Sequence, residues 1–526
     1  MTRELPTIPA SWCWSRLSSI ANIKGGLTKG QKRKSVDDLI SVPYLRVANV
    51  QRGYLDLSDV SYIEATQGEV DDLRLMIGDV LFNEGGDRDK LGRGWIWSGE
   101  IETCIHQNHV FRARIIENCL EPKFLSYWGN SAGKSYFFDE GKQTTNLASI
   151  NISKLGNLPV PIPPKPEQVR LLSELESYLS RLDAATASLE RVQAKLKAYR
   201  ASVLKAAVEG RLVPTEAERA RSEGRDYEPA SVLLDRILKE RRRRWEEAEL
   251  ARLTKSGKPP KDDKWKAKYE EPAAPDTSKL PKLPEGWCWA RAEQISEFIT
   301  KGTTPAKSEM CLNKGRIPYI KVYNLLFDGS IDFARDPTFI EEDVHRGFLE
   351  RSICFPNDVL MNIVGPPLGK VAVVPATFPE WNINQAIARY RPLTGLAPYY
   401  LAAVLLGDQA LQWAESRAKA TVGQFNLTLE IARDIPIPIA PEIEQQRIVD
   451  EVARQLSAAA AVSADVAANV VRCSRLRQSI LKWAFEGKLV DQDPHDEPAE
   501  ELLARIRAER AAAPGVKTRG RKAKAS

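Results

Sequence analysis

The stretches that decide the fold are Ala201 to Val213, ASVLKAAVEGRLV, and Gln478 to Val490, QSILKWAFEGKLV. They agree at 8 of 13 positions. Each closes a long run in which apolar residues recur every three or four positions, the spacing of one face of an α-helix. Gly210 and Gly487 stand in these stretches where a helix usually ends. One chain therefore contains the same long amphipathic helix twice.

Both helices are too long for the domains that precede them. Apolar residues mark the first from Glu167 on, at Leu172, Leu175, Leu179, Leu182, Leu189, Val192, Leu196, Tyr199 and Val203. They mark the second at Val452, Leu456, Ala459, Val462, Val466, Val470, Cys473, Leu476, Ile480 and Trp483. About 40 residues at 1.5 Å each span roughly 60 Å. We expect the helices to pair with each other, antiparallel, and to join and space two globular domains.

The rest of the chain repeats in the same order. The repeated stretches are Trp12-Cys13-Trp14 and Trp287-Cys288-Trp289, VPYLRVAN (42–49) and IPYIKVYN (317–324), GDVLFN (78–83) and NDVLMN (357–362), and LPVPIPP (158–164) and IPIPIAP (435–441). The period is too long for a solenoid, so a whole domain is duplicated. The tryptophans mark the start of each copy, and we expect them to be core anchors.

Within each copy, short alternating runs mix with glycine-rich turns and helical stretches, which is an α+β pattern. The predicted fold class is α+β, with two tandem globular domains of mixed α and β structure. Each domain is followed by a long α-helix, and the helices pair as an antiparallel coiled coil. The expected boundaries are a globular domain at 1–164, a helical spacer at 165–253, a Pro/Lys-rich linker at 254–283, a second globular domain at 284–441, a second helical spacer at 442–512 and a disordered basic tail at 513–526.

The composition limits the class of protein. The chain has 526 residues, 43% of them hydrophobic and 28% charged, which suits two to four folded domains. No window approaches the roughly 18 uninterrupted apolar residues of a membrane span, and the N-terminus lacks a secretory apolar run, so we expect a cytoplasmic protein. Seven cysteines without a CxxC pair argue against a disulfide framework or a zinc ribbon. The net charge of +6 gathers in KERRRR (239–244) and KTRGRKAK (517–524), a weak indication of nucleic-acid binding.

Motifs of catalysis do not fit. GPPLGKV (365–371) lacks one spacer residue and the hydroxyl of a P-loop. The double prolines match no amino-methyltransferase motif. Glu140-Gly141-Lys142 and Glu486-Gly487-Lys488 match only the shortest nuclease string, and the counterpart of the second, Glu209-Gly210-Arg211, suits a helix cap better. Cys104, His106 and His109 could hold zinc, yet the equivalent NINQAI (382–387) has no such ligand, so structural or DNA-proximal histidines are expected.

Further motifs of the second copy are LPEGWCWARAEQI (283–295) and GQFNLTLEIARDIPIPIAPEIEQQRIVDEV (423–452). With the repeats above, they resemble the specificity subunit of type I restriction-modification systems over nearly the whole chain. The resemblance implies two target recognition domains, each reading one half of a split double-stranded DNA sequence. It implies helical regions that fix the gap and dock two methyltransferase subunits, with restriction subunits in the complex. It also implies a non-catalytic chain that binds no cofactor or metal, with S-adenosylmethionine, ATP and Mg on the partner subunits.

In such domains Arg and Lys should hold phosphates, while Asn, Gln, Arg and Lys read base edges. The DNA-binding candidates of the first domain include the lysines and arginine of the glycine-rich loop KGGLTKGQKRK (24–34); together they are Lys29, Lys32, Arg33, Lys34, Arg46, Asn49, Arg88, Arg93, Lys142, Gln143 and Asn146. Those of the second are Lys301, Lys307, Lys314, Lys321, Asn324, Lys370, Gln424 and Asn426. The internal matches Arg46/Lys321, Asn49/Asn324 and Asn146/Asn426 could equally be structural, because the two domains should read different sequences.

Two other functions stay open on the sequence. A self-sufficient DNA modification enzyme would need methyltransferase motifs that the chain does not display. A coiled-coil scaffold without a DNA role would make the basic runs ordinary solvent-facing helix surfaces.

Overall fold

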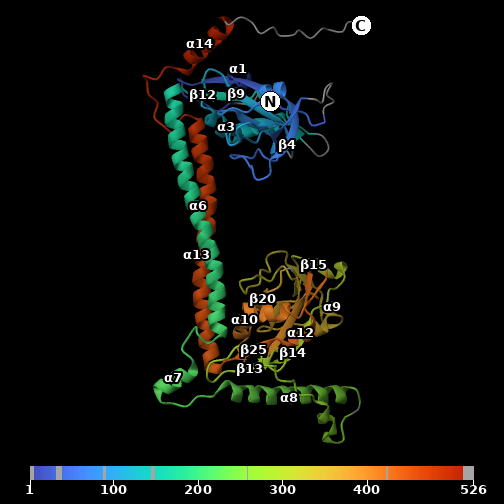
Figure 1. Ribbon diagram of the computed structural model, residues 1–526. Coiled ribbons are helices and arrows are strands. Elements are labelled where there is room, and N and C mark those ends of the chain that lie inside the picture. The colour runs from blue at the N-terminus through green and yellow to red at the C-terminus, as the bar shows by residue number, and fades with distance from the viewer. Residues whose placement is uncertain are drawn as a thin grey trace, which may run out of the picture. The chain divides into compact units, whose positions relative to one another are not determined.

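The structure is a computed structural model, and it describes residues 5–30, 38–86, 90–143, 148–257, 259–365, 367–421 and 424–512. Side chains are not described at 86, 142–143, 419–421, 424–425 and 509–512. The chain forms two compact units, Met1–Glu190 with Ala467–Ser526, and Arg191–Val466 (Figure 1). Unit 1 and unit 2 each contain one globular domain and a section of both long helices. The predicted α+β class is confirmed.

The first domain is built on small sheets that are antiparallel except for the parallel pair β3 and β8. Its central sheet has the order β2-β9-β5-β7, with β2 (Ala21–Gly25), β9 (Val110–Ile115), β5 (Val80–Asn83) and β7 (Gly94–Ile96). Beside it lie β4-β3-β8, with β4 (Ser61–Thr66), β3 (Leu39–Leu45) and β8 (Ile105–His106), and β10-β11-β6, with β10 (Lys142–Gln143), β11 (Ala148–Ser149) and β6 (Gly85–Gly86). β1 (Cys13–Arg16) pairs with β12 (Pro159–Ile162), so the two ends of the domain meet. Its helices are α1 (Leu17–Ile20), α2 (Gln67–Leu73), α3 (Pro122–Asn130), α4 (Gly133–Glu140) and α5 (Ile152–Gly156).

The second domain repeats this plan. Its central sheet is β14-β22-β18-β20, with β14 (Ser296–Lys301), β22 (Ile387–Pro392), β18 (Val359–Asn362) and β20 (Val371–Val373). Its other sheets are β15-β17-β16-β21 (Met310–Leu312, Thr338–Ile340, Ile317–Ile320, Asn382–Ile383) and β19-β24-β23 (Val364–Gly365, Gln424–Asn426, Lys419–Thr421). β13 (Cys288–Arg291) pairs with β25 (Pro436–Ile439). Its helices are α9 (Glu342–Arg346), α10 (Pro398–Leu406), α11 (Asp408–Glu415) and α12 (Leu429–Asp434), with 3-10 turns η3 (Lys307–Glu309) and η4 (Glu350–Ser352).

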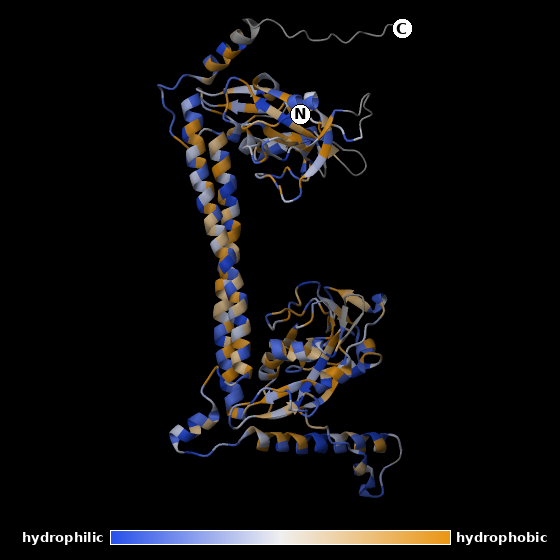
Figure 2. Cartoon of the chain, in the orientation of Figure 1, coloured by the Kyte–Doolittle hydropathy of each residue, from blue (hydrophilic) through white to orange (hydrophobic). Residues whose placement is uncertain are grey.

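The two long helices are α6 (Lys165–Val208) and α13 (Glu442–Phe485). In unit 1, Arg477 of α13 forms an ion pair with Asp183 of α6. In unit 2, the hydroxyl of Tyr199 on α6 donates to Oε1 of Gln455 on α13 at 2.8 Å. The partner numbers fall along one helix as they rise along the other, so the predicted antiparallel pairing is confirmed. Figure 2 shows hydrophobic and hydrophilic residues alternating along both helices.

By length and composition alone, α13 is apolar enough to cross a membrane, since its most apolar 18-residue window has a mean hydropathy of 1.3. Residues of this helix instead pack within the protein. Ile448 and Val452 are buried in the core of unit 2, and Ala484 and Phe485 in that of unit 1. These four residues lie near the two ends of α13, whereas only 11% of the apolar window is buried in the structure.

Each domain receives core residues from the helical segments that enter its unit. In unit 1 the end of α13 and the short helix α14 (Ala499–Ala512) contribute Phe485, Leu503 and Ile506 to the core around Trp12. In unit 2 the end of α6 and α8 (Ala230–Lys255) contribute Val203, Leu233 and Ile237 to the core around Trp287. Trp12 and Trp287 are thus core anchors, as predicted, whereas Trp14 and Trp289 are only half-buried.

The predicted helix-ending glycines are confirmed, and each has two reasons to be glycine. Gly210 and Gly487 have φ of 64° and 67°, which residues with a Cβ rarely adopt. A Cβ on Gly210 would lie 2.5 Å from Cγ of Pro284, and one on Gly487 would lie 2.3 Å from Cγ of Pro9. Each helix therefore ends against the proline that introduces a domain.

The basic run 239–244 lies on α8 and is largely neutralised. Arg242 pairs with Glu246 at 3.1 Å, Arg243 with Glu240 at 2.7 Å and Arg244 with Glu297 at 2.7 Å. Such pairs make this run a poor site for DNA phosphates. The chain continues from α6 through α7 (Glu216–Glu223) into α8, and then through η2 (Asp263–Lys268) toward the second domain. The basic tail 513–526 lies outside the described residues.

Candidate nucleic-acid interface

A loop that follows β3 in the first domain and β16 in the second carries basic side chains on a rigid frame. Asn49 is 3% exposed; its Oδ1 accepts from the backbone N–H of Arg46 at 2.8 Å, and its Nδ2 donates to the carbonyls of Asp56 and Asp59. Asn324 is fully buried and makes the same three bonds, with Lys321, Asp332 and Arg335. Both asparagines close the loop from within, which favours the structural alternative for this matched pair.

We name these segments the basic loops: residues 46–59 in the first domain and 321–336 in the second. A cation from another turn reaches each loop. This turn lies just before β7 in the first domain and just before β20 in the second. Arg93 donates from Nη1 to Oε1 of Gln51 at 3.1 Å in the first domain. Lys370 donates to the carbonyl of Val322 at 3.3 Å in the second. The structure therefore brings together Arg46, Asn49 and Arg93 in one domain, and Lys321, Asn324 and Lys370 in the other.

The basic loops differ in charge at equivalent positions. The carbonyls of Asp59 and Arg335 accept the same asparagine bond, so these residues correspond. Asp59 pairs with Arg46 at 2.8 Å and is 84% exposed. Burial, and then the charge of Arg335, lower the pKa of Lys370. Lys321 pairs in the same way with Asp336 at 3.3 Å. Each loop contains two Lys or Arg residues, against two aspartates in the first loop and three in the second, so the loops differ in where their charges stand.

Sequence reasoning missed Arg335 and the aromatic residues of these loops. Tyr54 is 57% exposed and Phe327 is 55% exposed, each within a basic loop. Lys370 lies 5.5 Å from the ring centroid of Phe327, and Lys321 lies 5.6 Å from that of Tyr323. Aromatic residues placed among cations are a signal that could have pointed to them, because such side chains can stack on bases.

Other candidates are exposed but lie away from these loops in sequence. Lys29 stands in a turn, Lys301 ends β14, Lys307 begins η3, Lys314 follows β15 and Asn426 ends β24; all five are exposed. The structure describes the backbone but not the side chains of Lys142, Gln143 and Gln424. Lys32, Arg33, Lys34, Arg88 and Asn146 lie outside the described residues.

The internal match of Asn146 with Asn426 is wrong by three positions. Ser149 pairs with Gly85 in the first domain, as Asn426 pairs with Val364 in the second. The side chains of Asn151 and Thr428 then cap α5 and α12 in equivalent positions. The sequence match was based on the dipeptide Asn-Leu, which occurs at 146–147 and at 426–427. The strand pairing and the helix caps give a different register between the two domains.

A second cation missed from the sequence is Arg417. Its guanidinium lies 3.9 Å from the ring centroid of Trp413 and donates to the hydroxyl of Ser416 at 3.1 Å. It shares an open groove with Asn426. Within the described residues it has no carboxylate partner closer than 4.0 Å. Arg417 is therefore held in place with N–H donors available to a ligand.

The Cys/His cluster of the first domain does not converge. Cys104 is buried, His106 contacts the carbonyl of Val110 at 2.6 Å through Nδ1, and His109 contacts Glu84 at 2.5 Å. Burial lowers the pKa of His106 to about 4, so this side chain is neutral at pH 7. Over the part of the chain that the structure describes, no group of three or more His, Cys, Asp or Glu residues could hold a metal ion.

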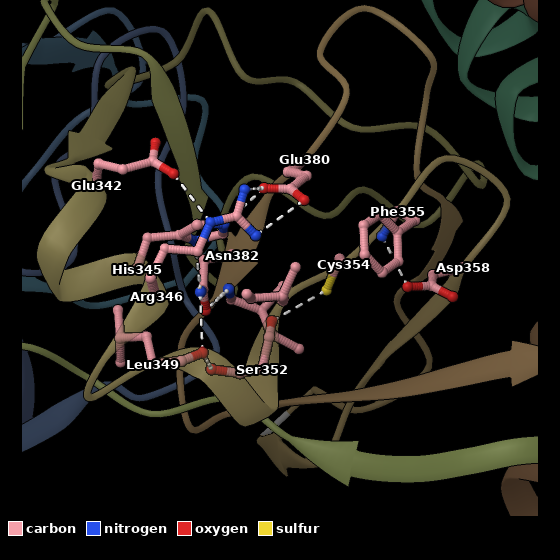
Figure 3. Close-up of polar contacts among 12 residues, drawn as sticks. Glu342, His345, Arg346, Leu349, Ser352, Cys354, Phe355, Asp358, Glu380 and Asn382 are labelled. Atoms are coloured by element: carbon pink, nitrogen blue, oxygen red, sulfur yellow. Dashed lines mark hydrogen bonds and ion pairs between the residues drawn. The ribbon is translucent and has the colours of Figure 1, made fainter. Parts of the chain in front are cut away.

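The second domain has its own buried histidine (Figure 3). His345 on α9 is fully buried; its Nε2 lies 3.1 Å from Glu380 and its Nδ1 lies 3.0 Å from Nδ2 of Asn382. Arg346 pairs with Glu342 and Glu380 across the same cluster. Asn382 also donates to the carbonyl of Leu349. These contacts tie α9 to β21 and have a structural role.

Comparisons with known proteins agree with this arrangement. A family model described as the type I restriction modification DNA specificity domain matches residues 9–198. The specificity subunit of the type I restriction enzyme EcoBI from Escherichia coli is 24% identical over 540 residues, which cover 98% of this chain and 96% of the relative.

Two solved structures share the fold. A chain from work on complex assembly and conformational transition of the type I R-M system has a TM-score of 0.62 at 17% identity, covering 92% of this chain and 99% of that one. The HsdS subunit from Thermoanaerobacter tengcongensis has a TM-score of 0.51 at 18% identity, covering 93% and 100%.

Proposed function

The chain belongs to the DNA specificity subunits of type I restriction-modification systems and is itself non-catalytic, and from this premise we propose that it binds a double-stranded DNA target in two parts, one domain to each part. The observation that carries the proposal is the pair of basic loops. Both are framed by a buried asparagine, both receive a cation from the equivalent turn, and they carry different residues at equivalent positions, such as Asp59 and Arg335. Two sibling surfaces of this kind suit two different half-sequences.

In each domain, exposed cations such as Lys29, Lys301, Lys307 and Lys314 would contact phosphates and set affinity. The side chains that differ between the domains would read bases; Arg335 and Arg417 join the predicted candidates in this role. Asn49 and Asn324 would position the loops without touching DNA. The candidates that stay predictions from the sequence are Lys32, Arg33, Lys34, Arg88, Lys142, Gln143, Asn146 and Gln424.

The long helices would set the gap between the half-sequences. Half-sites one helical turn apart, roughly 34 Å, present their grooves on one side of the duplex. We propose the boundaries 1–164 and 284–441 for the two recognition domains, with the helices as the spacer between them.

The same helices would dock two methyltransferase subunits, and restriction subunits would complete the complex. Exposed apolar side chains along α6 and α13 support this role: Val192 is 37% exposed, Val462 46% and Val471 50%. S-adenosylmethionine, ATP and Mg would then bind the partner subunits. A cytoplasmic location follows from such a complex acting on cellular DNA.

The test is a methylome of a host that expresses this chain with its methyltransferase partner. We expect methylated adenines in a split sequence with one gap length, and no methyl transfer by the purified chain alone. Methylation of a continuous, ungapped sequence would contradict the two-domain proposal. Methyl transfer by the chain alone would support a self-sufficient enzyme instead. DNA binding that is absent with the partner present, or insensitive to salt, would favour a scaffold, because phosphate contacts make affinity fall as salt rises.

A further inference from the structure

The first tryptophan of the repeated Trp-Cys-Trp reaches the first turn of a long helix in each unit. In unit 1, Nε1 of Trp12 donates to Oε2 of Glu167 at 2.9 Å. Trp12 is 5% exposed and Glu167 is 1% exposed. The contact joins the start of the first domain to the start of α6, two points 155 residues apart in sequence.

The other oxygen of Glu167 is bound by a third segment. Nε2 of Gln492, which follows α13, donates to Oε1 of Glu167 at 2.6 Å. Oε1 of Gln492 in turn accepts from the hydroxyl of Ser11 at 2.8 Å. Nearby, Arg170 of α6 pairs with Asp496 at 2.6 Å. One carboxylate therefore fixes the domain, α6 and the segment after α13 to one another.

Unit 2 contains the same junction. Nε1 of Trp287 donates to Oε1 of Glu444 at 3.0 Å, and the backbone N–H of Glu216, after α6, donates to Oε2 at 2.8 Å. Arg447 pairs with Glu216 at 2.6 Å, as Arg170 pairs with Asp496 in unit 1. Glu444 is fully buried.

The residue after each glutamate fixes the helix to a second part of its domain. Gln168 accepts from the N–H of Glu121, before α3, and donates to the carbonyls of Cys119 and Pro163. Gln445 accepts from the N–H of Ala397, before α10, and donates to the carbonyls of Gly395 and Ala440. Each long helix is thus held at its first turn by hydrogen bonds in several directions.

Buried carboxylates such as Glu167 and Glu444 are a costly way to stabilise the junction. Burial raises the pKa of both Glu167 and Glu444, which shows that the site disfavours their charge. Apolar packing would stabilise the junction without direction, whereas hydrogen bonds prefer particular angles. Direction matters at this point because α6 has 44 residues and is about 66 Å long. A tilt of roughly 5° at its first turn moves its far end by about 6 Å, nearly two base pairs at 3.4 Å each.

We infer that the Trp12–Glu167 and Trp287–Glu444 junctions are positioning sites that set the angle between each recognition domain and its helix, and through it the gap length that the subunit accepts. The inference rests on the proposed two-part recognition. Glu167 and Glu444 would not touch DNA, and the half-sequences would not depend on them.

The motif supplies its own matched controls. Trp12→Phe and Trp287→Phe remove the indole N–H and keep an aromatic ring in the core. Trp14→Phe changes the neighbouring ring, which packs 5.7 Å from Trp128, and Trp289→Phe removes only a bond to the carbonyl of Pro281. Each full-length variant is expressed with the methyltransferase partner, and the methylome is read at sites of every gap length.

We expect Trp12→Phe and Trp287→Phe to raise methylation at gaps one base pair longer or shorter by about tenfold relative to the wild type, which corresponds to about 1.4 kcal/mol of lost discrimination. Both half-sequences should stay unchanged, and Trp14→Phe and Trp289→Phe should keep a single gap. A single gap length in the Trp12 and Trp287 variants would overturn the inference, and so would equal relaxation in the controls.

A second variant tests the inference even if the tryptophan variants fail to fold. Gln492→Ala alters an exposed residue and removes one partner of Glu167, so it should relax the gap in the same direction without disturbing the core; an unchanged gap would again overturn the inference. If the wild type itself methylated an ungapped sequence, the proposed function would fail, and that result is distinct from an unrelaxed gap in the variants.

Discussion

Replacing Asp79 by asparagine should destabilise the first domain by about 3 kcal/mol and leave the second unchanged. Asp79 is 1% exposed; its Oδ1 accepts from Nε of Arg114 at 2.7 Å, and its Oδ2 accepts from Nη2 of Arg114 at 2.8 Å and from the N–H of Met76 at 2.7 Å. The substituted side chain could keep the backbone bond, but its amide N–H groups would then face the guanidinium. Asp358 makes the same set with Arg391 and Phe355, and its bond to Phe355 appears in Figure 3.

The size of the expected destabilisation follows from the exposure of Arg114, the partner of Asp79. Breaking a buried ion pair by removing one member costs about 3–5 kcal/mol. Arg114 has 34% of its side chain exposed and can recover some hydration, so we expect a cost at the lower end of this range. About 3 kcal/mol changes the folding equilibrium by roughly two powers of ten, and lowers the Tm of a unit of this size by about 6–12 °C.

Hydrogen exchange read by mass spectrometry on the full chain would measure this change locally. In Asp79→Asn, peptides from β5 and β9 should exchange roughly a hundredfold faster, and peptides from β18 and β22 should match the wild type. Asp358→Asn should give the reverse pattern. Asp59→Asn is the control, because its pair with Arg46 lies at the surface and should matter little. A destabilisation below about 1 kcal/mol, or an equal destabilisation of both domains, would refute the reasoning.

Four further predictions concern DNA and pH. Changing Lys301, Lys307 or Lys314 to alanine should weaken binding by the assembled complex equally for all sequences and lower the salt slope of log K by about 0.9 for each phosphate that is no longer neutralised; an unchanged slope would exclude a phosphate contact at that lysine. Exchanging residues 1–164 for another recognition domain should change one half of the methylated sequence, and a change in both halves would contradict independent reading. Deleting one heptad at facing positions of α6 and α13, about 10.5 Å, should shorten the gap by roughly three base pairs with both halves intact, and altered halves would count against a spacer role. Burial disfavours the charge of Glu216, but hydrogen bonds from Arg447 and Arg225 outweigh burial and lower the pKa of its carboxyl below 4.5. The stability that this carboxylate contributes is therefore present above pH 4.5 and lost as pH falls through the folded-state pKa. The acid unfolding curves of Glu216→Gln and the wild type should converge below pH 4.5, and curves that stay apart there would contradict this linkage.

The outcome at particular residues shows what a one-dimensional pattern can predict. The helical seam and the repeated glycines Gly210 and Gly487 predicted helix pairing and helix ends correctly, because both depend on local periodicity and backbone conformation. The residues that contact DNA stay predictions. Asn49 and Asn324 look like base readers in sequence, yet both are buried, because the loop that each one closes folds around it. The sequence did not single out Arg335 and Arg417 as candidates, since their exposure and neighbours depend on distant segments.

The sequence by itself determined the duplication, the α+β class and the two long helices, because hydrophobic spacing and repeated motifs are properties of neighbouring residues along the chain. Only the tertiary structure decided that Trp12 and Trp287 each meet a buried glutamate at the start of a long helix, and that the core of each domain receives residues from the helical segments that enter its unit. Those contacts join residues more than 150 positions apart, and their partners are fixed by packing and hydrogen-bond direction, which no local pattern encodes.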